Sequence, residues 1–353
     1  MAKYKIINGE GIIPNGTTEI EDDAFKMSSK LKSITIPESV TKIGKGAFCG
    51  CRKLTSINIP ESVTEIGGWA FEQCEALTSV TIPDSVTEIG DSAFSECYAL
   101  KSINIPNSVT EIGDYAFYEC NALTSINIPE SVTKIGKSAF SWCKALTRVT
   151  IPNSVTEIGD SAFSECYALK SINIPNSVTE IGAEAFSGCE ALTSINIPES
   201  VTWIGEDAFI GCGELTSIIV AEENKVYDSR NNCNAIIETK TNRLIQGCAN
   251  TVIPDSVTWI GDWAFSGCTA LTSITIPNSV TWIGNWVFSR CENLTEIILY
   301  QTDPSKIEIS GHSGLQKAQI TLYVPEEGVA AFQKDPFWSE YADIKPIADD
   351  MLK

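Results

Sequence analysis

Residues Leu123–Ala145 read LTSINIPESVTKIGKSAFSWCKA, and most of the chain repeats this phrase. An Ile-Pro step returns every 23 residues from Pro14 to Pro198, and it returns again at Pro254 and Pro277 after ten additional residues. The Ala-Phe pair keeps the same spacing, and residues 85–113 are identical to residues 154–182. A fixed period of this size indicates a solenoid in which each repeat forms one coil.

Each repeat contains a segment that we expect to be a β-strand. In the repeat that begins at Leu54, Ile57 and Ile59 should point inward while Ser56 and Asn58 face solvent, because side chains alternate along a strand. The proline that follows should end the strand, since it has no N–H to donate. The Ser-Val-Thr-x-Ile-Gly segment should form a second short extended piece, with its glycine in a conformation forbidden to other residues. The near-helical spacing of Ala-Phe-x-x-Cys-x-x-Leu predicts one or two helical turns on the outer side.

The apolar positions can be buried only by stacking one coil on the next, so identical residues should form columns. About 12 coils at a strand spacing of about 4.8 Å would extend roughly 60 Å. The phenylalanines should then stack on one another, and each aromatic pair adds about 1 kcal/mol beyond its burial.

The repeated phrase resembles the BspA-like, or treponemal-type, leucine-rich-repeat family. The likeness covers Ile13 to about Ile347 and includes the ending ITLYVP at Ile320–Pro325, which precedes Phe332 and Trp338. The resemblance implies a curved, right-handed solenoid without catalytic activity and with a role in adhesion or protein binding. We therefore predict a β-rich leucine-rich-repeat solenoid of about 12 coils with short helical turns, a hairpin insertion and a C-terminal cap.

Departures from the phrase divide the chain. We predict an N-terminal capping coil at 1–35, regular repeats at 36–220, a degenerate turn with a β-hairpin at 221–250, further repeats at 251–300 and a C-terminal cap at 301–353. In the hairpin, pairing of Glu238 with Arg243 would place Cys233 opposite Cys248. These two cysteines would form a disulfide in an oxidising compartment and would be close free thiols otherwise.

Composition excludes several functional classes. The 353 residues carry a formal net charge of −20, which disfavours nucleic acid and anionic membrane surfaces as partners. The sequence contains no run of 18 apolar residues, so we do not expect it to insert into a membrane. Residues 1–20 lack the pattern of a signal peptide. The chain as given is therefore expected to be cytoplasmic, or surface-exposed or secreted if a leader has been removed.

The sequence contains no catalytic or cofactor signature. His312 is the only histidine, so no Ser-His-Asp or Cys-His arrangement can form without it. Ten of the 13 cysteines keep the repeat spacing and should act as small core residues, and no zinc-binding spacing occurs. The acidic pairs Glu88–Glu111 and Glu157–Glu180 leave a divalent-cation site as an alternative to simple solvation. We predict no enzyme activity, no cofactor and no resident metal.

Two surfaces are candidates for binding. The outward residues of the strands are mostly Ser and Asn, such as Asn127 and Asn173, and Arg148 interrupts them. They form either a solvated ladder or a polar binding face centred near Arg148. Trp203, Trp259 and Trp282 occupy one repeat position, and Trp263 and Trp286 occupy the next exposed one. These indoles either bind a partner, including a second copy of the chain, or are covered by the hairpin.

The sequence therefore favours a non-enzymatic scaffold that binds a protein. The alternatives are a surface or secreted adhesin that binds host or matrix proteins, and a glycan-binding module that uses the tryptophans.

Overall fold

The computed structural model describes residues 4–311, 314 and 317–348. Counted along these residues, the chain makes about 14 turns of a β-solenoid with little helix. This is close to the count of about 12 coils expected from the repeat. Two compact units can be distinguished, and each is described by itself. Unit 1 comprises the described part of Met1–Glu190 with Trp203–Ala208, and unit 2 comprises Ala191–Thr202 with the described part of Phe209–Lys353.

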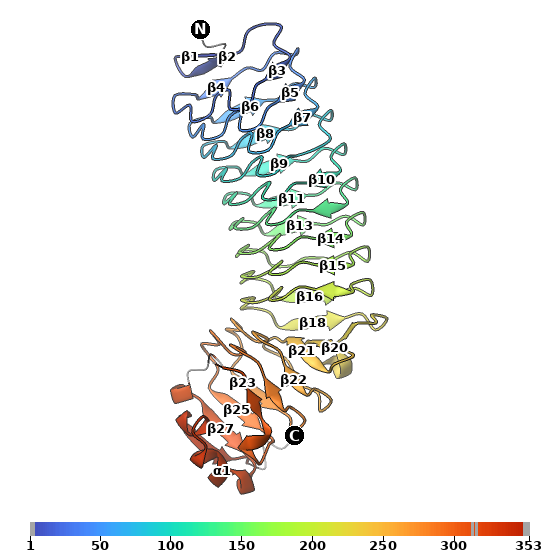
Figure 1. Ribbon diagram of the computed structural model, residues 1–353, viewed down its shortest axis with the longest axis vertical. Coiled ribbons are helices and arrows are strands. Elements are labelled where there is room, and N and C mark those ends of the chain that lie inside the picture. Colours follow the sequence, from blue (N-terminus) through green and yellow to red (C-terminus); the bar gives the residue numbers. More distant parts are fainter. Residues whose placement is uncertain (1–3, 312–313, 315–316, 349–353) are drawn as a thin grey trace. The chain divides into compact units, whose positions relative to one another are not determined.

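Unit 1 contains two ladders of short parallel strands (Figure 1). The first begins with an antiparallel pair and continues coil by coil through β1 (Lys5–Ile7), β2 (Glu10–Ile12), β4 (Ser33–Ile34), β6 (Ser56–Asn58), β8 (Ser79–Thr81), β9 (Ser102–Asn104), β11 (Ser125–Asn127) and β13 (Arg148–Thr150). Its residues pair with a shift of 23, as in Ser56 with Ser79 and Ser125 with Arg148. Ile57 and Ile59 are buried while Ser56 and Asn58 are exposed, which confirms the predicted alternation.

The second ladder of unit 1 is formed by the Ser-Val-Thr-x-Ile-Gly segments, which we call the corner segments. Its two-residue strands are β3 (Glu19–Ile20), β5 (Lys42–Ile43), β7 (Glu65–Ile66), β10 (Glu111–Ile112), β12 (Lys134–Ile135), β14 (Glu157–Ile158), β15 (Glu180–Ile181) and β17 (Trp203–Ile204). Bridges through Ile89 join β7 to β10, so the ladder is continuous. In every strand the second residue is buried and the first faces solvent.

The phenylalanines of unit 1 form a single column, as the repeat predicts. Eight of them, from Phe25 to Phe186, stack with centroids 5.2–5.6 Å apart and nearly parallel planes. The Tyr4 ring lies 5.1 Å from Phe25 and covers the N-terminal end of the column. The core is therefore a continuous file of rings flanked by isoleucine, valine and leucine.

The outer segments are not helical, which corrects the prediction from their spacing. Backbone N–H groups donate alternately within a coil and to the next coil: Glu72 N donates to Trp69 O at 3.1 Å, whereas Phe71 N donates to Ala93 O at 2.8 Å. Positive φ at Trp69 (58°) and Gln73 (57°) makes this alternation possible. The buried residues of the outer segments have near-helical spacing, but the backbone there consists of tight turns. These turns form a third set of hydrogen bonds between successive coils, in addition to the two strand ladders.

The glycines of the corner segment serve a purpose different from the predicted one. Gly113 and Gly136 do not have positive φ. A methyl group on Gly136 would instead lie 2.7 Å from the Gly113 carbonyl carbon and 2.8 Å from the Asp114 nitrogen. Glycine is required here because the backbones of successive coils approach too closely for a side chain.

Unit 2 contains the hairpin insertion within its own ladder. The elements in order are β16 (Ser194–Ile197), β18 (Ser217–Val220), β19 (Tyr227–Asp228), η1 (Arg230–Asn232), β20 (Ile236–Glu238), β21 (Arg243–Gln246), β22 (Trp259–Ile260), β24 (Trp282–Ile283) and β26 (Glu308–Ile309). β20 and β21 are antiparallel, with Glu238 opposite Arg243, and β21 then pairs in parallel with β22.

Buried Asn224 fixes the degenerate turn that precedes the hairpin. Its amide nitrogen donates to Pro198 O at 2.8 Å and Val201 O at 2.9 Å. Its amide oxygen accepts from Val226 N and Tyr227 N, each at 2.9 Å. A single side chain therefore satisfies four backbone groups where the consensus sequence is lost.

The last coils of unit 2 carry the remaining elements. The strands are β23 (Ser273–Ile276), β25 (Glu296–Leu299), β27 (Thr321–Val324) and β28 (Asp343–Pro346), and the helical turns are η2 (Pro304–Lys306), η3 (Lys317–Gln319), η4 (Glu326–Gly328), α1 (Val329–Lys334) and η5 (Trp338–Glu340). Phe332, Trp338 and Tyr341 are buried among these elements, and Phe337 packs against them. Aromatic residues thus close the apolar interior where the repeat ends.

Candidate binding surfaces

The polar strand face lies on the first ladder of unit 1. Arg148 is exposed on β13 beside Ser125 of β11, and a bridge joins it to Ser171. Asn127 and Asn173 are also exposed. Among the described residues, neither asparagine side chain forms a hydrogen bond and Arg148 forms no ion pair. These groups are free to bind water or a partner, and a binding role stays a prediction.

Four tryptophans lie on two successive coils of unit 2. We call Trp259, Trp263, Trp282 and Trp286 the tryptophan flank. Trp259 pairs with Trp282 across β22 and β24, and their rings meet edge to face at 6.0 Å. Trp263 and Trp286 follow in the outer turns and stack at 5.6 Å with planes 12° apart. Trp286 is 39% exposed and the other three tryptophans are half-buried, so all four rings present part of their surface to solvent.

The hairpin covers only part of this flank. Arg243 of β21 lies beside Trp259 in the ladder, and its guanidinium carbon is 4.6 Å from the indole centroid. Trp259 Nε1 and Arg243 Nε are buried and lack hydrogen-bond partners within the described residues. Arg243 was missed by the sequence reasoning, because the position of the parallel β21–β22 pairing cannot be derived from a broken repeat.

Trp203 is not part of the tryptophan flank, because the ladder partner that precedes Trp259 within unit 2 is Arg243. Trp203 is 47% exposed on β17 of unit 1, where its ladder partner is Glu180. The position before Trp259 is occupied by Arg243. The insertion has replaced the neighbour that a regular repeat would have supplied.

The two hairpin cysteines are buried free thiols. A register shift between Ile236 and Ile237 changes the pairing that would have placed them opposite each other. Cys248 Sγ donates to Asn234 O at 3.3 Å, and burial raises the pKa values of both thiols. Their disulfide in an oxidising compartment stays a prediction.

The repeat cysteines are more than apolar fillers. Cys97 Sγ donates to Phe71 O at 3.2 Å, and Cys143 Sγ donates to Phe117 O at the same distance. The equivalent contact recurs along both units, as in Cys291 with Phe265 O at 3.1 Å. Burial raises the pKa of Cys143 to about 12, so the thiols stay protonated and unreactive.

The acidic column is partly neutralised by lysines. Lys42 and Lys134 each form a 3.0 Å ion pair, with Glu65 and Glu157 respectively. The part of the chain that the structure describes contains no group of three or more His, Cys, Asp or Glu residues that could hold a metal ion. Its helices are all too short or too polar to cross a membrane. His312 lies outside the described residues.

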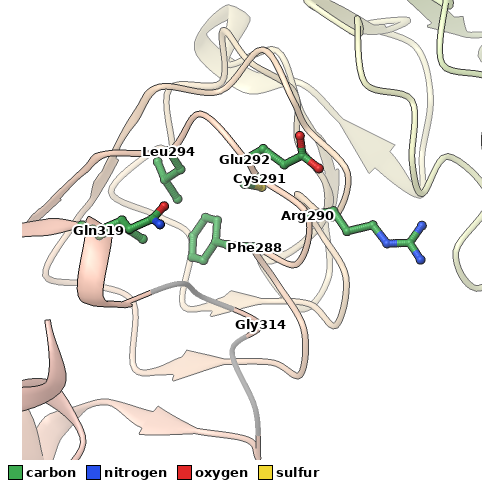
Figure 2. A pocket seen from close by; sticks show the side chains of 8 residues that line it. Phe288, Arg290, Cys291, Glu292, Leu294, Gly314 and Gln319 are labelled. Carbon is green, nitrogen blue, oxygen red and sulfur yellow. The ribbon is translucent and has the colours of Figure 1, made fainter. Parts of the chain in front are cut away.

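A small cavity in unit 2 illustrates how tightly the coils are filled. Figure 2 shows Phe288, Leu294 and Gln319 around it, while Arg290 points away. Its volume is about 20 Å³, which accommodates about one water molecule. This cavity is therefore too small for a substrate or cofactor.

Comparisons with known proteins agree with this architecture. The family model described as "BspA type Leucine rich repeat region (6 copies)" matches residues 9–124, 110–237 and 236–339. The structure is similar to a leucine-rich repeat protein from Bacteroides ovatus, with 27% identity, a TM-score of 0.62 and 98% of each chain covered. It is also similar to a leucine rich cell surface protein from Faecalibacterium prausnitzii, with 29% identity, a TM-score of 0.57, and 91% of this chain and 89% of that chain covered. A search of functionally curated proteins found no match. The chain belongs to the BspA-type leucine-rich-repeat family.

Proposed function

We propose that this chain is a non-enzymatic scaffold that binds a protein, and that the tryptophan flank is its main contact surface. Proteins with this fold are typically protein-binding or surface proteins and generally act without catalysis. The observation that carries the proposal is that four indoles on two successive coils form two ring contacts, one edge to face at 6.0 Å and one stacked at 5.6 Å. Contiguous exposed aromatic surface commonly marks an interface, and tryptophan is enriched at binding hot spots.

Arg243 adds a polar group to this surface. Its guanidinium carbon lies over the Trp259 ring, and its buried Nε has no partner within the described residues. Arg243 is half-buried, so an incoming carboxylate or carbonyl could accept a hydrogen bond from the part of the guanidinium that faces solvent. We therefore expect the partner to present an apolar segment next to an acceptor.

The test compares two variants of the full chain. One carries Trp259→Ala, Trp263→Ala, Trp282→Ala and Trp286→Ala. The control is Trp69→Ala, which removes one 43% exposed indole from the repeat position that Trp263 and Trp286 occupy. Each variant is checked for folding by circular dichroism and used to capture proteins from extracts, with quantitation by mass spectrometry. Proteins retained by the wild type and by the control should be lost with the fourfold variant, and equal retention by a folded fourfold variant would reject the flank.

The same flank could instead join two copies of this chain. Sedimentation equilibrium separates the two cases, because a homodimer through the flank would dissociate in the fourfold variant and persist in Trp69→Ala. A wild type that is monomeric at micromolar concentration would assign the flank to a different protein.

A second candidate is an adhesin at the cell surface. It is supported by the similarity to the F. prausnitzii protein, which is described as a cell surface protein. Surface labelling of intact source cells with a membrane-impermeant reagent would test it, and labelling seen only after lysis would count against it. A glycan-binding module that uses the indoles is tested by tryptophan fluorescence with a panel of sugars. The absence of saturable change would reject glycan binding.

A further inference from the structure

The outer side of unit 1 carries an acidic and aromatic surface distinct from those considered above. It is formed by residues on either side of the repeat cysteines. We call six of them the outer strip: Glu96, Tyr98, Glu119, Trp142, Glu165 and Tyr167. All six side chains are half-buried, so each presents part of its surface to solvent.

Backbone hydrogen bonds hold the strip in register. Glu96 N donates to Tyr118 O at 2.7 Å, Glu119 N to Ser141 O at 2.9 Å, and Trp142 N to Ser164 O at 2.8 Å. The residue before each cysteine therefore lies on a hydrogen-bonded edge, at the same height in every coil. The strip is consequently a rigid row instead of a set of independent loops.

Side-chain contacts orient the acids and the rings toward each other. The Tyr98 hydroxyl donates to Glu96 Oε2 at 2.8 Å, and Gln73 Nε2 donates to Glu96 Oε1 at 3.4 Å. Tyr167 makes the equivalent hydrogen bond to Glu165, which raises the pKa of Tyr167 to about 12. Trp142 meets Tyr167 edge to face at 6.0 Å. The carboxylates are thus held beside aromatic rings before any ligand arrives.

The charge of this surface is unbalanced. The residues flanking the cysteines from Gln73 to Glu190 include Glu75, Glu96, Glu119, Glu165 and Glu190 but only one cation, Lys144. Arg52 neutralises Glu75 through a 3.3 Å ion pair. The Lys144 ammonium lies 5.1 Å from the centroid of Trp142. Lys144 therefore places a cation near the ring of Trp142. A cation of a partner could bind in the same way to the other aromatic rings of the strip.

The sequence duplication gives the strip a repeat of its own. Residues 85–113 and 154–182 are identical, so Glu96 with Tyr98 recurs as Glu165 with Tyr167 three coils later. Three coils at about 4.8 Å place the two pairs about 14 Å apart. An extended peptide advances about 3.4 Å per residue, so side chains about four residues apart match this distance.

We propose that the outer strip binds an extended basic segment of a partner protein, with Arg or Lys residues four positions apart held by the Glu96–Tyr98 and Glu165–Tyr167 pairs. Each pair offers a carboxylate and an aromatic ring to one cation, and cation–π contacts add to the ion pairing. The proposal concerns unit 1 and does not depend on the tryptophan flank.

The test measures binding of fluorescein-labelled peptides to the full chain by fluorescence anisotropy at low ionic strength, where surface charge is least screened. One peptide has two arginines four positions apart in a Gly/Ser background, and a second has the same composition with the arginines adjacent. We expect the spaced peptide to bind at least fivefold more tightly. Equal affinities of the two peptides, or no measurable binding, would overturn the proposal.

Matched variants separate the strip from general electrostatic attraction. Glu96→Gln with Glu165→Gln removes the two duplicated acids and should weaken the spaced peptide at least tenfold. Glu111→Gln with Glu180→Gln makes the same change in net charge on the second ladder and should change affinity less than twofold. Similar losses in both variants would refute a specific site. The fourfold tryptophan variant should bind the peptide normally, so failure of the flank and failure of the strip give different results.

Discussion

Gly136→Ala offers a direct test of how the coils of this solenoid are joined. In the structure, an added methyl group would lie 2.7 Å from the Gly113 carbonyl carbon and 2.8 Å from both Asp114 N and Asp114 Oδ1. Ordinary contacts of a Cβ atom begin near 3.4 Å. The two coils would therefore have to separate locally by about 0.6 Å, since the obstructing atoms belong mainly to the backbone.

The cost follows from the bonds that span this contact. Gly136 N donates to Ile112 O at 3.0 Å, and Lys137 N donates to Asp114 Oδ1 at 2.8 Å. A separation of about 0.6 Å would stretch both toward the limit of a hydrogen bond. Overpacking of this kind costs about 1–3 kcal/mol, and weakening the two bonds adds about 1 kcal/mol. We expect Gly136→Ala to lower the free energy of unfolding by about 2–4 kcal/mol.

Gly68→Ala is the matched control. Gly68 also lacks positive φ, and its nearest obstruction is Asp91 O at 3.2 Å. The equivalent position carries a side chain in other coils, for example Asp91 and Lys137. The control should be neutral or stabilising by up to about 1 kcal/mol, because alanine restricts the unfolded chain.

Urea unfolding followed by circular dichroism measures both variants, and hydrogen exchange shows where the loss occurs. Because each coil contacts only its neighbours, faster exchange should be concentrated around Gly136 and in the coils on either side. If Gly136→Ala and Gly68→Ala differ by less than 1 kcal/mol, close backbone approach is not the reason for the corner glycines.

Three further predictions concern the thiols, the outer turns and the insertion. Burial raises the pKa of Cys143 from its ordinary 9.0 to about 12. Between these pH values the folded chain keeps the thiol proton and the unfolded chain loses it. The free energy of unfolding should therefore fall as the pH rises from 9 to 12. Each such thiol contributes about 1.4 kcal/mol per pH unit to the slope of the free energy of unfolding against pH. Urea unfolding at several pH values should give a shallower slope for Cys143→Ala than for the wild type. An unchanged slope would contradict the raised pKa of Cys143. Gln73 has φ of 57°, so Gln73→Gly should be about 1 kcal/mol more stable in urea than Gln73→Ala, and equal stability would show that this conformation carries no cost. Asn224→Ala leaves four backbone groups without their side-chain partner, so it should lower the free energy of unfolding by about 2–4 kcal/mol. Hydrogen exchange in β19 and β20 should become faster. Asn250 is exposed, so Asn250→Ala should change the free energy of unfolding by less than about 0.5 kcal/mol. Equal effects of the two asparagine variants would remove Asn224 as the residue that fixes the turn.

The sequence was sufficient to predict which side chains are buried. The inward Ile57 and Ile59 and the stacked Phe48 and Phe71 follow from a period of 23 because each coil repeats the environment of the last. The backbone path of the outer turns could not be predicted in this way. The spacing of apolar residues indicates which side chains face the core. It does not determine whether a backbone N–H group such as that of Phe71 donates within its own coil or to the next coil.

The candidate surfaces show why single residues in a repeat protein are hard to interpret. Residues at the same repeat position of successive coils are ladder neighbours, and they are 23 residues apart in the sequence. Non-consensus residues therefore form a surface patch only if they occur at the same position in successive coils. Trp263 and Trp286 satisfy this condition and stack, whereas Trp69 follows Gly46 and precedes Ser92 and therefore stands without an aromatic neighbour in its column. The insertion breaks the interval, which is why Arg243 of the hairpin is the ladder partner of Trp259. A binding surface on this fold is therefore a property of successive coils, and variants that change one coil at a time should weaken it in steps instead of abolishing it.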